Sequence, residues 1–114
     1  MTPPRLASSV LVSALVRRAE SLGGFAAVLA KGDATAGSIV LILSERGRKV
    51  GILERVLQAG GHYLWQDTAS QHVDNEQEIS DFVKRRRGFD PDLWVVELDI
   101  PSPERFAAEM NSVG

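Results

Sequence analysis

The chain has 114 residues with 44% hydrophobic and 25% charged side chains, a composition typical of globular proteins, and we expect residues 1–114 to form a single domain. Its formal net charge of −2 gives no general attraction to nucleic-acid phosphates or anionic lipids, and no apolar run approaches the roughly 18 residues that a membrane span needs. There is no cysteine, which excludes disulfides, thiolate catalysis and cysteine-based zinc sites and is compatible with a soluble protein of the reducing cytoplasm.

The first predicted element is an amphipathic helix from residue 8 or 9 to residue 22. Gly23 and Gly24 follow it and are expected to end it. Apolar side chains recur with the helical period and predict a buried stripe formed by Leu11, Ala14, Leu15, Ala19 and Leu22.

Three apolar segments come next, at residues 25–30, 38–43 and 49–57. The links between them are short and rich in turn residues, which favours antiparallel neighbours and predicts a meander. Residues 62–66 alternate loosely between apolar and polar, and we interpret them as a fourth strand at the edge of the sheet.

A second helix is predicted from Asp74, which suits an N-cap, to about Arg87. Its apolar face recurs at i, i+3 and i+4 and consists of Ile79, Phe82 and Val83. We expect Gly88 to adopt the left-handed conformation that ends many helices, and Phe89 to fold back on Val83.

Pro91 then fixes a turn, and a strand follows up to Ile100. Its alternation predicts one buried face, formed by Trp94, Val96, Leu98 and Ile100. On the other face, Glu97 and Asp99 are expected to emerge into water. Residues 101–110 are interpreted as a short final helix.

The order helix, three or four strands, helix, strand, helix predicts an α+β domain. We expect a single mainly antiparallel sheet of four to five strands with the helices packed on one face. The last strand is expected beside the central one, in either direction.

Arg85, Arg87 and the run Phe-Asp-Pro-Asp-Leu-Trp-Val at residues 89–95 resemble the signature of the domain of unknown function 1491 family, a group of short alphaproteobacterial proteins. The pairs Gly-Asp at 32–33 and Ala-Gly at 36–37 also fit the pattern, and the similarity extends from about residue 5 to residue 99. Two features depart from it: Arg86 stands where the family usually has glutamine, and a helix replaces an often polar tail. The resemblance implies no activity, because the family has none assigned.

No catalytic, metal or cofactor site is predicted. His62 and His72 have no helical ligand spacing, and we interpret both as surface or turn residues. The element order matches that of restriction-endonuclease-like nucleases, which keeps open the alternative of a metal-dependent nuclease or other small hydrolase. Asp33 and Glu54 would be its carboxylates, but Val56 occupies the position where such a site needs lysine.

The basic run at residues 84–87 has a structural and a functional interpretation. Acidic residues at the start of this helix and basic ones at its end are what the helix dipole favours, and consecutive side chains diverge, so nucleic acid is an unfavoured partner. Trp94 is expected in the core, whereas Trp65 on the edge strand is the better candidate for a surface aromatic.

We therefore predict a small non-catalytic binding or interaction module whose partner is a protein or a small molecule. Its expected recognition surface lies at the end of the second helix and includes Arg85, Arg87, Asp90 and Asp92. Three further arginines are candidate neighbours of that surface: Arg17, Arg18 and Arg55. Pairing of two copies through a strand edge stays open as a third possibility.

Overall fold

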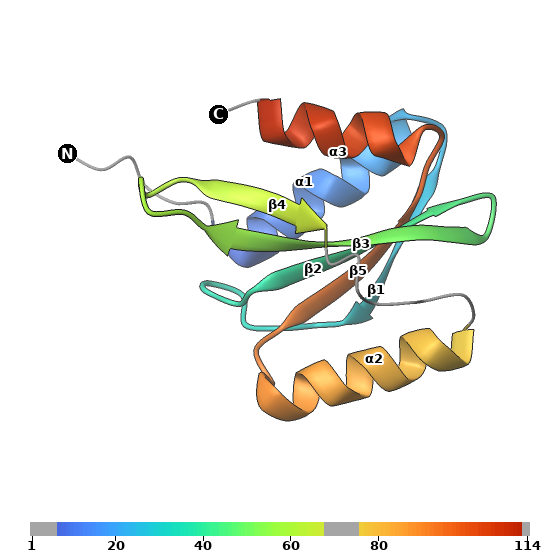
Figure 1. Cartoon of the computed structure of the whole chain (residues 1–114). Helices are drawn as coiled ribbons and strands as arrows, with labels where there is room; N and C mark the ends of the chain where they lie inside the picture. The colour runs from blue at the N-terminus through green and yellow to red at the C-terminus, as the bar shows by residue number, and fades with distance from the viewer. Residues whose placement is uncertain (1–6, 68–75, 113–114) are drawn as a thin grey trace.

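A computed structural model describes residues 7–67 and 76–112 of the chain (Figure 1). The elements occur in the predicted order. They are α1 (Ser8–Ser21), β1 (Phe25–Ala30), β2 (Ile39–Glu45), β3 (Arg48–Leu57), β4 (Tyr63–Asp67), α2 (Glu76–Phe89), β5 (Trp94–Asp99) and α3 (Pro103–Ser112). The proposed N-cap Asp74 and the histidine His72 lie outside the described residues. No helix among those described is long and apolar enough to cross a membrane.

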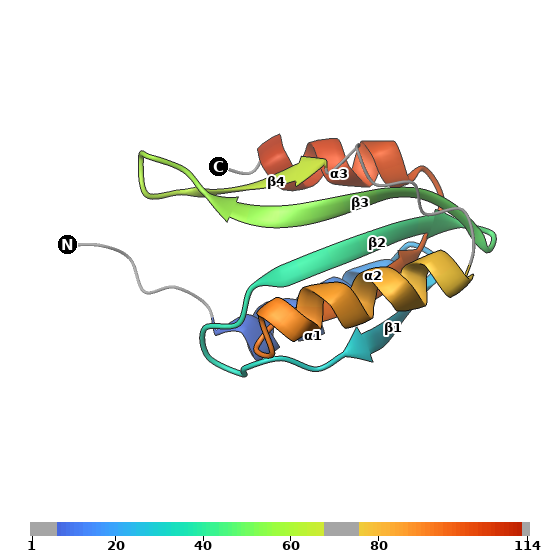
Figure 2. The same ribbon diagram turned by 60° about the horizontal axis from the view of Figure 1, so that its bottom comes forward.

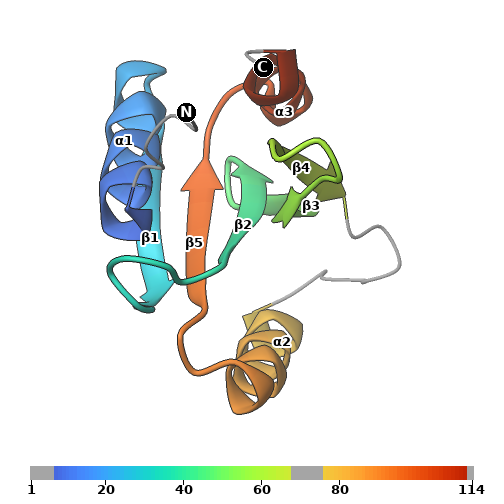
Figure 3. The same ribbon diagram turned by 90° about the vertical axis from the view of Figure 1, so that its left-hand side faces the viewer.

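The five strands form one sheet in the order β1-β5-β2-β3-β4, so the α+β class and the single mainly antiparallel sheet are confirmed (Figure 3). Strands β2, β3 and β4 form the predicted meander. The predicted antiparallel pairing of β1 with β2 is wrong, because β5 lies between them, antiparallel to β1 and parallel to β2. β5 carries fully buried apolar side chains on both faces, which is typical of a central strand.

The helices cover both faces of the sheet rather than one: α1 and α3 lie on one face and α2 on the other (Figure 3). The core under α1 and α3 includes Leu41, Trp94 and Leu98. The core under α2 includes Val40 and Val95. Because β2 and β5 present large apolar side chains in both directions, each face of the sheet needs a helix to exclude water.

The first helix packs as expected through Leu15 and Ala19, while Val12 replaces Leu22 in its buried stripe. Leu22 is exposed because the helix ends before it. The chain then leaves through Gly23, whose φ of 86° is a left-handed conformation that glycine adopts without strain, and the Gly24 N–H donates back to Ala19 O at 3.0 Å.

The second face of β5 does not emerge into water, contrary to the expectation for Glu97 and Asp99. Asp99 is only 8% exposed, and its carboxylate accepts hydrogen bonds from the backbone N–H groups of Arg46 (2.9 Å) and Gly47 (2.7 Å). Both residues have positive φ, at 53° and 81°, and form the tight turn between β2 and β3. Asp99 therefore joins the end of β5 to this hairpin.

Candidate functional site

The corner between α2 and β5 is a tightly hydrogen-bonded turn. Helix α2 continues through Gly88 to Phe89, so the prediction that Gly88 ends it in a left-handed conformation is wrong. The Asp90 N–H still donates to Arg86 O at 2.9 Å, and the Leu93 N–H donates to Asp90 O at 3.1 Å. The Asp90 carboxylate accepts the N–H of Asp92 at 3.1 Å, which closes the turn before β5.

The loop between β1 and β2 is hydrogen-bonded to this turn. The Asp33 N–H donates to Asp92 O at 3.0 Å, and Nε1 of Trp94 donates to Asp33 O at 2.7 Å. Gly32 and Gly37 pack so closely on the turn that a Cβ atom on either would stand 2.1 or 2.3 Å from Asp92 O. Much of the signature at residues 89–95 thus serves to join the corner to this loop.

Phe89 is the exception, because 88% of it is exposed at the tip of the corner. The prediction that it folds back on Val83 is wrong, since the helix continues through Phe89 and leaves its side chain exposed. Phe89 follows Arg85 by four residues, so the two side chains share one side of the helix. We call Arg85, Arg87, Phe89, Asp90 and Asp92 together the corner surface.

The two arginines of the corner surface play different parts. The guanidinium of Arg87 donates from Nη2 to Pro91 O at 2.8 Å, and its Nε is buried with no hydrogen-bond partner among the described residues. Arg87 therefore stabilises the turn. Arg85 is exposed, and its guanidinium lies 5.9 Å from the ring centre of Phe82. Arg85 and Phe89 lie on the same side of α2.

The three other predicted arginines lie elsewhere, so they do not extend the corner surface. Arg17 and Arg18 are on α1, on the opposite face of the sheet from α2 (Figure 3). Arg18 donates from Nη2 to Glu109 of α3 at 2.9 Å. Sequence spacing cannot reveal this separation, because it depends on which face each helix covers.

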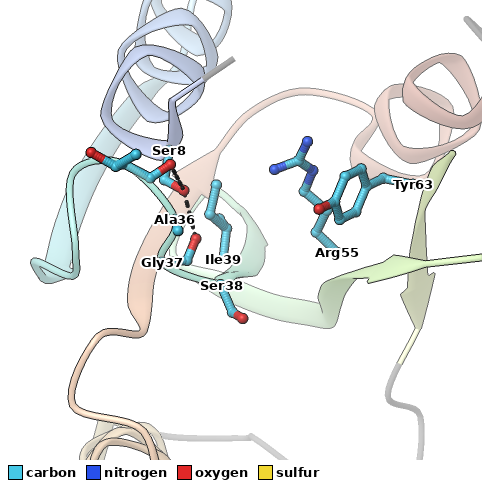
Figure 4. A pocket seen from close by; sticks show the side chains of 8 residues that line it. Ser8, Ala36, Gly37, Ser38, Ile39, Arg55 and Tyr63 are labelled. Carbon is cyan, nitrogen blue, oxygen red and sulfur yellow. Dashed lines mark hydrogen bonds between the residues drawn. The ribbon is translucent and has the colours of Figure 1, made fainter. Parts of the chain in front are cut away.

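Arg55 lines a hollow of about 200 Å³ on the α1 side of the sheet (Figure 4). Its guanidinium stacks on Tyr63, 3.8 Å from the ring centre. On the opposite wall, the hydroxyl of Ser8 donates to Gly37 O at 2.6 Å. The hollow thus offers one stacked cation facing a loop in which the carbonyl groups of Thr35 and Gly37 already accept hydrogen bonds from Ser8.

Acidic side chains proposed for a nuclease do not form a metal site. Glu54 pairs with Arg86 across to α2. The Asp33 carboxylate accepts the N–H groups of Thr35 (3.2 Å) and Ala36 (2.8 Å) in its own loop. Within residues 7–67 and 76–112, no group of three or more His, Asp or Glu side chains could hold a metal ion.

A charged network, buried except at Glu76, lies under the first turn of α2. Lys49, whose side chain is 8% exposed, pairs with Glu97 of β5 and with Glu76 of α2 at 3.3 Å. The Ser44 hydroxyl also donates to Glu97, at 2.6 Å. Burial acts to lower the pKa of Lys49, but the hydrogen bonds and charges of Glu97 and Glu76 outweigh burial and raise that pKa above its ordinary value. Ser44 is fully buried, whereas the Glu76 side chain is 85% exposed, so the network reaches the surface at Glu76.

Comparison with known proteins gives one consistent result. The model of the DUF1491 family, described as a protein of unknown function, matches residues 6–108. A solution structure of a DUF1491 family protein from Caulobacter crescentus CB15 is 30% identical, with a TM-score of 0.73, and the match covers 88% of this chain and 90% of that one.

Two further solved structures are similar. A crystal structure of a DUF1491 family protein from Caulobacter crescentus CB15 is 32% identical over 82% of this chain and 86% of that one, with a TM-score of 0.71. A solution structure of a protein from A. tumefaciens is 33% identical over 87% and 89% of the two chains, also with a TM-score of 0.71. A search of curated proteins finds no significant match.

Proposed function

The chain belongs to the DUF1491 family of proteins of unknown function, and we propose that it is a small non-catalytic binding module whose partner contacts the corner surface. The observation that carries the proposal is the exposure of Phe89, 88% of which faces solvent at the tip of a rigid turn. Transferring such a ring from water into a partner's recess releases about 2 kcal/mol, so an aromatic held this way is an effective anchor.

Rigidity of the corner supports the proposal. The turn beside Phe89 is fixed by Asp90, by the Arg87 guanidinium and by the loop at Asp33. A partner therefore has little ordering entropy to overcome there. A surface that holds an exposed aromatic on a preorganised turn is better suited to binding than one on a loose loop.

Charge indicates the chemistry of the partner. Arg85 is exposed on the side of α2 that Phe89 occupies, so a complementary surface would combine an apolar recess with a carboxylate. We propose a protein partner of that kind. Nucleic acid is a poorer fit, because Arg86 pairs with Glu54 and Arg87 bonds to the Pro91 carbonyl.

The two alternatives receive less support. A metal-dependent nuclease or other small hydrolase would need Asp33 and Glu54, whose carboxylates hold a loop and an arginine instead. A small-molecule partner stays a prediction, and the hollow beside Arg55 is where it would apply.

The proposal is tested by affinity capture from an alphaproteobacterial extract at physiological salt, with quantitative mass spectrometry of the retained proteins. Phe89→Ala and Arg85→Ala remove the anchor and the charge of the corner surface. Lys84→Ala is the matched control, because it removes a neighbouring charge from a different side of α2.

We expect at least one protein to be retained by the wild type and by Lys84→Ala, and to be lost about tenfold or more from both corner variants. Equal retention by all four proteins, or loss only from Lys84→Ala, would contradict the proposal. Circular dichroism of each variant establishes that all four are folded.

A further inference from the structure

The two outer edges of the sheet differ in how they are closed. At β4, the side-chain amide of Asn111 in α3 accepts the N–H of Trp65 at 2.8 Å and donates to Trp65 O at 2.9 Å. This amide occupies the place of a neighbouring strand and satisfies the outward backbone groups there. β4 also ends in the exposed residues Gln66 and Asp67, which discourage pairing with another chain.

β1 has none of these protections. Its sequence, Phe-Ala-Ala-Val-Leu-Ala, contains no charge and no proline. Among the described residues, no turn, loop or side chain hydrogen-bonds the outer side of β1. Figure 2 shows no strand beyond it, and Figure 3 shows α1 alongside it. Its only irregularity is a register shift between Val28 and Ala30, which leaves residues 25–28 as a regular edge.

Exposed apolar side chains accompany this open edge. Phe25 is 58% exposed, Val28 47% and Leu29 41%. Val28 pairs across the sheet with Val96, so it lies on the face under α1, whereas Phe25 pairs with Asp99 on the opposite face. This edge has apolar side chains on both faces of the sheet and unpaired backbone groups between them. Such an edge favours association with another chain in water.

We propose that β1 pairs antiparallel with β1 of a second copy of this chain, which joins the two sheets into one of ten strands. Two-fold symmetry requires a surface that complements itself, and a strand without charge opposes no like charges when paired with its own copy. An axis at Ala27 places Val28 opposite the partner subunit's Ala26, so that a larger side chain meets a smaller one.

Charges at the two ends of β1 favour the same arrangement. Lys31 follows the C-terminal end of β1. Antiparallel pairing places this end beside the N-terminal end of the partner's β1, where the chain leaves α1. The last turn of α1 carries the exposed Arg18 as well as the exposed Glu20, so the attraction for positive charge there comes from the C-terminus of the helix itself. Lys31 thus meets the C-terminal end of α1 on the partner, once on each side of the axis.

The test is the molar mass of the purified chain, measured by sedimentation equilibrium from about 1 μM to about 500 μM. An interface built on one short strand is small, so we expect micromolar association, with twice the 12.4 kDa chain mass at the upper concentrations. Val28→Lys places a charge on each side of the axis and is expected to weaken association at least tenfold.

Val10→Lys is the matched control, because Val10 is 49% exposed on α1 and lies outside the edge. It should dimerise like the wild type. A wild-type chain that stays at 12.4 kDa up to about 500 μM, or a Val28→Lys variant that dimerises as well as the wild type, would overturn the proposal. So would a dimer that Val10→Lys abolishes while Val28→Lys does not.

Discussion

Lys49 and Arg18 both form ion pairs with glutamate, but burial makes their contributions unequal. The Lys49 side chain is 8% exposed, whereas those of Arg18 and Glu109 are 52% and 44% exposed. Lys49→Met leaves Glu97 without its cation in a buried site and should lower the free energy of unfolding by about 3 kcal/mol. Arg18→Met should cost at most about 1 kcal/mol. Urea denaturation of both variants tests this, and equal losses would contradict it.

The raised pKa of Lys49 also predicts a pH dependence. Because this pKa is higher in the folded chain than in the unfolded one, the pair contributes fully below the unfolded value of about 10.4. The contribution is lost as the pH rises through the folded pKa. The stability difference between wild type and Lys49→Met should therefore stay constant from about pH 7 to 9.5 and shrink above about 10.4. A difference that grows with pH would contradict the assignment.

Trp94 shows what alternation along a strand can and cannot predict. The apolar face of β5 correctly predicts its burial, and it is 4% exposed. The hydrogen bond from Nε1 to Asp33 O could not be predicted, because it joins positions 61 residues apart. We expect Trp94→Ala to cost about 3–5 kcal/mol, through the cavity and the lost bond. A melting temperature within a few degrees of wild type would show that the ring contributes little.

At the scale of elements, the contact between the 32–37 loop and the α2–β5 turn is the most constrained. A methyl group at Gly37 would stand 2.3 Å from the Asp92 carbonyl oxygen and must displace backbone. Gly37→Ala should therefore lower stability by about 3 kcal/mol, the upper part of the range for overpacking. Gly51→Ala is the control, since nothing lies within 4 Å of its added Cβ. Thermal unfolding tests this prediction, and equal melting temperatures for the two variants would contradict it.

Most elements could be predicted from local pattern, but their arrangement in the sheet could not. The periods of apolar residues and the turn residues between them identify all eight elements to within a few residues. The insertion of β5 between β1 and β2 depends on nonlocal packing. The placement of α2 follows from it, because Val40 and Val95 form an apolar face that α1 and α3 do not cover. Alternation in β5 also misplaced Glu97 and Asp99, whose partners come from the β2–β3 hairpin.

At the scale of the molecule, the candidate site was predicted in part. Pro91 and the charged residues around it predict a turn near Asp90 with arginines beside it, so the sequence indicates residues 85–92 as a candidate site. Exposure of Phe89 could not be predicted, since a phenylalanine after an apolar helix face is usually buried. The dispersal of Arg17, Arg18 and Arg55 depends on which face each helix covers, a property of the whole sheet.

Contact at the corner surface in the cell is the most direct test of the proposed function. A photoreactive p-benzoylphenylalanine in place of Phe89 keeps an aromatic ring at the tip of the corner, and irradiation links it to whatever touches it. The same residue at Leu57, 48% exposed on β3, is the control. We predict a discrete crosslinked protein at position 89 that is absent at position 57 and is lost when Arg85→Ala is added. Adducts at position 57 alone, or an adduct at 89 unaffected by Arg85→Ala, would contradict a partner bound at this surface.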